Sequence, residues 1–261
     1  MKTKFLYALL IIVTGCGFSS SLYQDILTAQ EYIEKRKFNK AAEIYSSILL
    51  KKPSQNVKIK INDQLGDIYS IYLNNYTKSI EHYNNIVQDS TNPTQQVNAL
   101  EKIGNIYFEN LKDYKKSKKI YKKLADFFPA LQKKDQYVFK YALSFFYLNE
   151  FEQATEILKK IINSKATGDS SVLAYYYLGL SKFYEGKWDE ANKYWFEYLK
   201  RENRNDRIVK TKFLIANAYE SAEKLKEAYN IYYSILGEYP NSEVIENRLK
   251  SLYERRVSRK R

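Results

Sequence analysis

The chain has 261 residues, a formal net charge of +13 and an apolar content of 44% that includes 26 tyrosines. Its only cysteine, Cys16, excludes a disulfide within the chain, and its only histidine, His82, has no plausible nucleophile or metal-ligand set around it. Length and apolar content suffice for a sizeable core, so packing alone can stabilise the fold.

The chain begins with the pattern of a secretory signal peptide. Lys2 and Lys4 give a positive start, and the apolar run 5–13 that follows is too short to span a bilayer. We therefore expect residues 1–15 to be a signal peptide and the protein to be exported. No later stretch of the sequence approaches the length of an apolar membrane span.

The residues around the cysteine add a second expectation. Val13-Thr14-Gly15-Cys16 resembles the lipobox of bacterial lipoproteins, which implies cleavage before Cys16 and a covalent lipid on its thiol. An ordinary signal peptide with an incidental free cysteine is the alternative. The absence of Asp after Cys16 implies delivery to the outer membrane, facing the periplasm, or display outside the plasma membrane where no outer membrane exists. Residues 16–21 then form a short lipidated tether.

Small residues recur at regular intervals along the rest of the chain. One set lies in one amphipathic run and a second set in the next, and each second-set residue precedes the following first-set residue by 25 positions. The first set is Ala29, Gly66, Gly104, Ala142, Gly179 and Ala216; the second is Ala41, Ser79, Ser117, Ala154, Ala191 and Ala228. Such spacing predicts helical hairpins in which small side chains let two helix axes approach closely.

Aromatic and proline residues follow the same period. An aromatic lies three residues after most first-set residues, another lies four after most second-set residues, and Pro53, Pro129 and Pro240 each close a unit. This pattern resembles the tetratricopeptide repeat, although the unit here is 37 or 38 residues instead of about 34. The resemblance implies an all-α fold, a superhelical solenoid of six helical hairpins over 22–240 and no strands.

The period also places the individual helices. The predicted pairs are 22–35 with 38–51, 55–73 with 76–89, 94–111 with 114–127, 131–148 with 151–164, 169–185 with 188–201, and 205–222 with 225–238. Residues 241–261 are expected to form a capping helix and a basic tail. Arg248, Lys250 and Arg255 are expected on the exposed face of that helix.

Repeats of this family bind peptides along a groove formed by their first helices. The groove-facing positions are aromatic in the fourth and fifth units and polar in the second and third. They are Phe139, Phe146, Tyr147, Tyr176, Phe183 and Tyr184, and Asp63, Asp67, Glu101 and Asn105. We expect the aromatic positions to hold apolar side chains of a protein partner. The alternative is that the longer helices bury these rings as ordinary core.

The sequence gives little support for catalysis or nucleic-acid binding. Pairs such as Asp63 and Asp67 are common on helix surfaces, and no phosphate loop, zinc spacing or serine elbow is present. We therefore expect no enzyme activity, no metal and no cofactor other than the lipid on Cys16. The positive charge has two alternative interpretations. It indicates either a solvated Lys-rich surface or a surface that attracts anionic lipid or acidic partners.

The function that these features indicate is a lipid-anchored scaffold. The junction Tyr239-Pro240-Asn241-Ser242, the lipobox and the repeats resemble the BamD family of lipoproteins of the β-barrel assembly machine, although that family has five repeats. This implies protein partners in the bacterial envelope. The periplasmic cell-division coordinators with the same repeats begin with a coiled coil for which this chain has no room. A solute- or glycan-binding lipoprotein with an aromatic groove is the alternative from another class.

Overall fold

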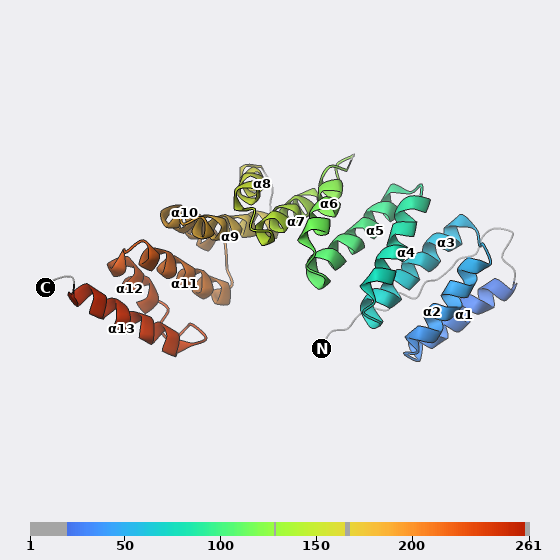
Figure 1. Ribbon diagram of the computed structural model, residues 1–261, viewed down its shortest axis with the longest axis horizontal. Coiled ribbons are helices and arrows are strands. Elements are labelled where there is room, and N and C mark those ends of the chain that lie inside the picture. Colours follow the sequence, from blue (N-terminus) through green and yellow to red (C-terminus); the bar gives the residue numbers. More distant parts are fainter. Residues whose placement is uncertain (1–19, 128, 165–167, 259–261) are drawn as a thin grey trace. The chain divides into compact units, whose positions relative to one another are not determined.

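The computed structural model describes residues 20–127, 129–164 and 168–258, so the expected signal peptide and Cys16 lie outside the described residues. The chain forms two compact units, Met1–Ala99 and Leu100–Arg261. Every regular element in the described ranges is helical (Figure 1). The all-α prediction is therefore confirmed.

The helices follow one another as antiparallel pairs. In the first unit these are α1 (Ser20–Glu34) with α2 (Phe38–Leu50), and α3 (Gln55–Asp67) and η1 (Ile68–Tyr72) with α4 (Tyr76–Asp89). Helix α5 (Pro93–Asn105) crosses the boundary between the units and continues as η2 (Ile106–Asn110), which is followed by α6 (Tyr114–Ala125). The second unit continues with α7 (Lys134–Tyr147) and α8 (Phe151–Asn163), α9 (Asp169–Tyr184) and α10 (Trp188–Leu199), α11 (Asn205–Ser221) and α12 (Leu225–Tyr233), and α13 (Ser242–Ser258).

These elements are the six predicted hairpins and the predicted last helix. Most helix ends lie within a few residues of the prediction, but α12 ends at Tyr233 instead of residue 238. The chain forms turns after Tyr233, and Gly237 adopts a φ of 88° that a helix cannot contain. The backbone at Gly237 therefore excludes a helix that continues to residue 238.

The small residues lie at the helix crossings, as the spacing predicted. The second-set residues Ala41, Ala154, Ala191 and Ala228 are fully buried. A Cβ atom added to Gly179 would lie 2.3 Å from Nε1 of Trp195, and one added to Gly66 would lie 2.3 Å from Cε1 of Tyr83. Each of these two glycines therefore admits a large ring of the second helix against the backbone of the first.

Two first helices end in a π-helical turn that the sequence analysis did not predict. These turns are η1 and η2. The interval between the two small residues of a hairpin is 13 in these two pairs, Gly66 to Ser79 and Gly104 to Ser117, and 12 in the other four. A π turn accommodates one extra residue without ending the helix. It therefore explains why these units have 38 residues instead of 37.

All six hairpin turns use the same backbone conformation. One residue in each turn has a φ between 51° and 74°, and the next residue donates its amide hydrogen to a carbonyl near the end of the first helix. The six residues are Arg36, Asn74, Lys112, Asn149, Gly186 and Glu223. This is the left-handed C-terminal cap of a helix, which favours glycine, yet only one of the six is a glycine.

Candidate functional site

The six predicted aromatic groove residues do not share one environment. Phe139 and Phe146 are buried, at 7% and 8% exposure, and Tyr176 and Phe183 are half-buried. Tyr147 is 41% exposed and Tyr184 is 60% exposed. The aromatic positions therefore fall into two groups. The two buried phenylalanines lie in the core, and the two exposed tyrosines lie on the surface.

The two exposed tyrosines each stack on a ring from the preceding hairpin. Tyr147 at the end of α7 stacks on Tyr114 at the start of α6, with ring centroids 4.7 Å apart. Tyr184 at the end of α9 stacks on Phe151 at the start of α8, with centroids 5.3 Å apart. We call Tyr114, Tyr147, Phe151 and Tyr184 the aromatic surface. It lies at the edge of the second unit where the first helices end and the second helices begin.

The buried Phe146 supports the aromatic surface from below. Its ring centroid lies 5.5 Å from that of Tyr147, 5.5 Å from that of Phe151 and 6.0 Å from that of Tyr184. The hydroxyl oxygens of Tyr147 and Tyr177 are 3.3 Å apart. Burial and this hydroxyl contact raise the pKa of Tyr177 above its ordinary value. Rings packed in this way lose little side-chain freedom on binding, which suits a binding surface.

The polar groove positions use their acceptors within the protein. Asp67 accepts a hydrogen bond of 2.6 Å from the Tyr83 hydroxyl of its own hairpin, and Asp63 lies half-buried on the same helix. Burial and the Asp67 carboxylate raise the pKa of Tyr83. The hydrogen bond of Asp67 therefore connects the two helices of the second hairpin, and the role of both acids in partner binding stays a prediction.

The other two polar positions join neighbouring hairpins. Asn105 accepts hydrogen bonds from the Tyr121 hydroxyl at 2.8 Å and from Nζ of Lys140 at 2.6 Å. Glu101 accepts from Nζ of Lys133 at 3.0 Å and from the Tyr137 hydroxyl at 3.2 Å. Both lysines and Tyr137 belong to the α6–α7 connection or to α7 itself. These contacts hold the third hairpin against the fourth.

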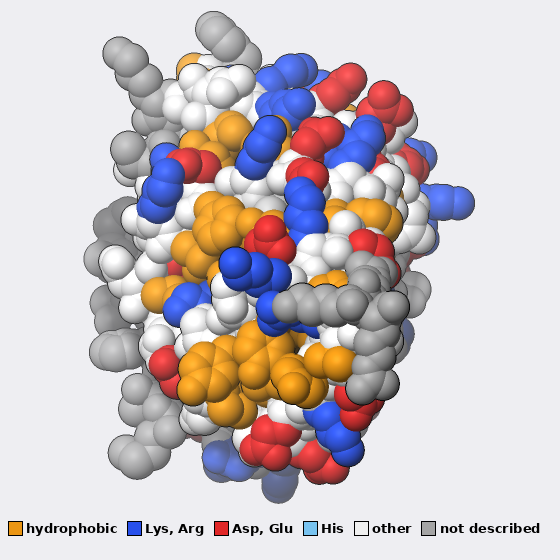
Figure 2. Space-filling model, turned by 90° about the vertical axis from the view of Figure 1, so that its left-hand side faces the viewer, with side chains coloured by type: hydrophobic (Ala, Val, Ile, Leu, Met, Phe, Trp, Pro, Cys, Tyr) orange, Lys and Arg blue, Asp and Glu red, His pale blue; other side chains and the backbone are white. Residues whose placement is uncertain are grey.

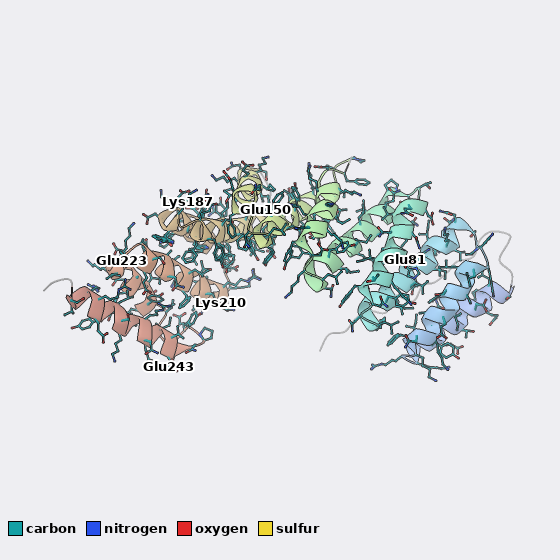
Figure 3. All side chains as sticks on the ribbon, viewed as in Figure 1. Glu81, Glu150, Lys187, Lys210, Glu223 and Glu243 are labelled. Atoms are coloured by element: carbon teal, nitrogen blue, oxygen red, sulfur yellow. The ribbon has the colours of Figure 1, made fainter. Side chains whose placement is uncertain are left out.

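Ion pairs flank the aromatic surface. Nζ of Lys118 lies 2.8 Å from Glu150, and Glu185 accepts hydrogen bonds from Lys182 at 2.8 Å and Lys187 at 2.7 Å. Figure 3 labels Glu150 and Lys187 on this part of the chain. Burial acts to raise the pKa of Glu185, but the two lysines outweigh it and hold the pKa below its ordinary value. The turns beside the surface are thus fixed by charge-assisted contacts.

The basic residues predicted on the exposed face of α13 differ in their exposure. Arg248 and Arg255 contact Glu220 of α11 at 3.4 Å and 3.0 Å. Arg255 also contacts Glu223, which Figure 3 labels at the α11–α12 turn. With Phe183 and Asn217 these arginines line an open hollow of about 460 Å³. Figure 2 views this end of the molecule, where hydrophobic side chains gather between basic and acidic ones. The exposed-face prediction is confirmed for Arg248 and Lys250, which are exposed, whereas Arg255 is half-buried because Glu220 and Glu223 contact it.

The described ranges contain no group of three or more His, Cys, Asp or Glu residues that could hold a metal ion, and none of their helices has the length and apolarity of a membrane span. Nδ1 of His82 lies 2.9 Å from Oδ1 of Asn62, and its ring stacks on Tyr69 at 5.6 Å. Burial lowers the pKa of His82. These contacts give His82 a structural place between α3 and α4.

The sequence analysis missed two members of the aromatic surface, Tyr114 and Phe151. A signal for them exists, because an aromatic lies three residues before the second-set small residue in five of the six hairpins. The same position in the first hairpin is Phe38, whose ring stacks on Tyr72 with centroids 4.0 Å apart. An aromatic at the start of one second helix therefore pairs repeatedly with an aromatic at the end of the next first helix.

Part of the chain matches the model of a known repeat family. The family model described as tetratricopeptide repeat matches residues 98–130, 136–164, 173–201 and 211–242. No curated protein sequence is similar enough to count as a match. The chain is similar to the C-terminal part of a tetratricopeptide-repeat protein from Cytophaga hutchinsonii, with a TM-score of 0.67, 16% identity and coverage of 87% of each chain.

Two further solved structures share the fold. PilW, described as a widely conserved type IV pilus biogenesis factor, has a TM-score of 0.55 and 17% identity, covering 90% of this chain and all of its own. PilF of Pseudomonas aeruginosa has a TM-score of 0.53 and 12% identity, covering 90% of this chain and 97% of its own. At these identities the likeness is one of fold alone.

Proposed function

Because this chain contains tetratricopeptide repeats, and proteins built from these repeats bind protein partners, we propose that it is a non-catalytic scaffold whose aromatic surface holds a protein partner. The observation that carries the proposal is the pair of exposed tyrosines, Tyr147 and Tyr184, stacked on rings of neighbouring hairpins above the buried Phe146. Exposed rings on a rigid base are typical of residues that dominate binding energy at protein interfaces.

The proposal includes the place where the scaffold works. A lipid on Cys16 would hold the repeats at a membrane of the bacterial envelope, at the periplasmic face of the outer membrane in a cell that has one. The support is the sequence around Cys16 and the apolar run before it. Outer-membrane protein assembly is the process that the BamD-like features favour, and pilus biogenesis is the competing process because PilW and PilF share the fold.

Partner capture tests the scaffold. The native protein and a Tyr147→Ala/Tyr184→Ala variant are purified from solubilised membranes, and the proteins that co-purify are identified by mass spectrometry. We expect the partners that co-purify with the native protein to be missing from the variant. Truncation of an aromatic residue that dominates an interface costs at least about 2 kcal/mol of binding free energy. If the missing partners are barrel-assembly proteins, they favour outer-membrane protein assembly. If they are pilus proteins, they favour pilus biogenesis.

The matched control is Phe146→Ala. This ring is 8% exposed, so its truncation should lower the free energy of unfolding by roughly 3–5 kcal/mol. The double tyrosine variant should retain nearly all of its stability. Capture that survives the loss of both tyrosines would contradict the proposal, and a bound glycan without any protein partner would favour a glycan-binding lipoprotein instead.

Membrane attachment is tested separately. The native protein should partition into detergent, and its processed first residue should be Cys16 with fatty acid attached. A Cys16→Ser variant should stay in the aqueous phase once its signal peptide has been removed. A mature protein that lacks fatty acid would contradict the anchor without affecting the partner-binding proposal.

A further inference from the structure

Helix α6 carries an unusual charge pattern. Its twelve residues, Tyr114–Ala125, contain six lysines and no acidic residue. The second helices of the other five hairpins each contain at least one Asp or Glu. The pattern is therefore a property of one hairpin and does not follow from the Lys-rich composition of the chain as a whole.

Half of the lysines of α6 are neutralised by contacts. Lys116 lies 3.1 Å from Asp113, Lys118 lies 2.8 Å from Glu150, and Lys122 pairs with Asp126. These three also lie over the rings of Tyr107, Phe145 and Tyr141. They serve to hold α6 against its neighbours.

The other three lysines and the turn residue before the helix have no such contacts. The side chains of Lys112, Lys115, Lys119 and Lys123 are exposed and make no hydrogen bond or ion pair with any residue that the structure describes. Lys115, Lys119 and Lys123 follow one another at intervals of four, which places them on one helical face. We call these four residues the lysine row; its helical part is about 12 Å long at 1.5 Å per residue.

The lysine row points away from the core. The buried residues of α6 are Ser117, Tyr121, Leu124 and Ala125, which occupy the opposite side of the helix. Leu111, 45% exposed, directly precedes the row at the hairpin turn between η2 and α6. The face thus combines one apolar side chain at its end with four exposed lysine side chains that form no ion pair with any described residue.

We propose that the lysine row binds the anionic surface of a lipid bilayer. Flexible ammonium groups in a row require no fixed spacing of their counter-charges, and anionic lipids diffuse within the bilayer to match them. Leu111 can enter the interface between headgroups and acyl chains at the end of the row. The row contains no arginine fork and no aromatic ring on which a base could stack, features that nucleic-acid surfaces use.

Vesicle binding tests this inference. The test variant replaces Lys112, Lys115, Lys119 and Lys123 by Gln, and the control variant replaces Lys159, Lys160, Lys193 and Lys226, exposed lysines of α8, α10 and α12. Both variants lose the same net charge. All proteins are full-length and carry Cys16→Ser, so no covalent lipid contributes and the amino-terminal segment is identical in each.

Binding is measured by sedimentation with vesicles of phosphatidylcholine alone and with one third phosphatidylglycerol. We expect the protein with the unsubstituted lysine row to bind the anionic vesicles at least about tenfold more tightly than the phosphatidylcholine vesicles. This preference should fall with added salt. The Gln variant of the row should lose the preference, while the control variant should retain most of it.

Three results would overturn the inference. These are equal losses in both variants, binding to both vesicle types alike, and row-dependent binding to a single-stranded RNA or to polyglutamate in the absence of vesicle binding. Circular dichroism of both variants checks that their helices remain folded. None of these results depends on the partner that the aromatic surface binds.

Discussion

At the scale of single residues, Gly179 shows how closely two helices can approach. The Trp195 ring lies where a Cβ would be, and its Nε1 hydrogen is donated to the carbonyl oxygen of Tyr176 at 3.1 Å. Gly179→Ala should therefore displace the ring and lower the free energy of unfolding by about 1–3 kcal/mol. Urea denaturation followed by tryptophan fluorescence measures the change.

Gly104 provides the comparison. An added Cβ there would lie 3.1 Å from Cγ2 of Ile120 and 3.1 Å from Cζ of Tyr121, so small adjustments of these two side chains can accommodate it. Gly104→Ala should cost less than Gly179→Ala and can be neutral, because alanine favours a helix. An equal loss in the two variants would show that ring displacement is not the cause.

Glu202 is a buried carboxylate that organises the loop between α10 and α11. It accepts hydrogen bonds from Nε of Arg204 at 3.0 Å, from the Tyr198 hydroxyl at 2.6 Å and from two backbone amides of the loop. The hydrogen bonds of Arg204 outweigh the effect of burial, and with those of Tyr198 they hold the pKa of Glu202 well below its ordinary value. The folded state therefore favours the ionised carboxylate.

The stabilisation that the Glu202 carboxylate provides has a defined pH dependence. Because the pKa is lower in the folded state, the stabilisation is fully present above the unfolded value of about 4.3 and is lost as the pH falls below it. Glu202→Gln should lower the free energy of unfolding by about 1–3 kcal/mol at neutral pH. The difference between the two proteins should shrink in acid. A difference that stays constant with pH would contradict this assignment.

At the scale of elements, the hairpin turns place non-glycine residues in a left-handed conformation. Arg36, at the α1–α2 turn, has a φ of 57° and an exposed side chain. Arg36→Gly should raise the free energy of unfolding by roughly 0.5 kcal/mol, because relief of the left-handed strain slightly exceeds the added entropy of the unfolded chain. A thermal melt measures it, and a lowered melting temperature would contradict the argument.

The reverse change at Gly186 is the control. This residue fills the same position at the α9–α10 turn with a φ of 74°. Gly186→Ala introduces a Cβ into the left-handed conformation and should destabilise the protein by about 1 kcal/mol. Space is not the cause, since no atom lies within 4 Å of the added Cβ.

The hairpins themselves were predictable because helix pairs with a fixed crossing point impose a fixed period on small residues. The π turns were not predicted, although the interval of 13 in place of 12 residues contains the information. The sequence also did not predict which of the aromatic groove residues are buried and which are exposed. Helical spacing places Phe146 and Tyr147 as neighbours at the end of α7, but only the packing of α8 and α9 buries one ring and exposes the other.

At the scale of the whole molecule, the repeat pattern extends further than the family model. The model matches four segments from residue 98 onward, whereas α1–α4 form the same hairpins, with the same small-residue crossings, in residues 20–89. The aromatic surface and the lysine row both belong to the second unit. The two surfaces therefore lie within one compact unit, and their proposed roles can be tested independently.

Site-specific photocrosslinking tests the central claim most directly. A photoreactive amino acid replaces Tyr147 or Tyr184 in cells, and in control proteins it replaces Tyr233 or Tyr253, which are 63% and 62% exposed and lie outside the aromatic surface. The account predicts a crosslink to the same protein partner from both positions of the aromatic surface and none from the controls. Equal crosslinking from all four positions, or none from Tyr147 and Tyr184, would contradict it.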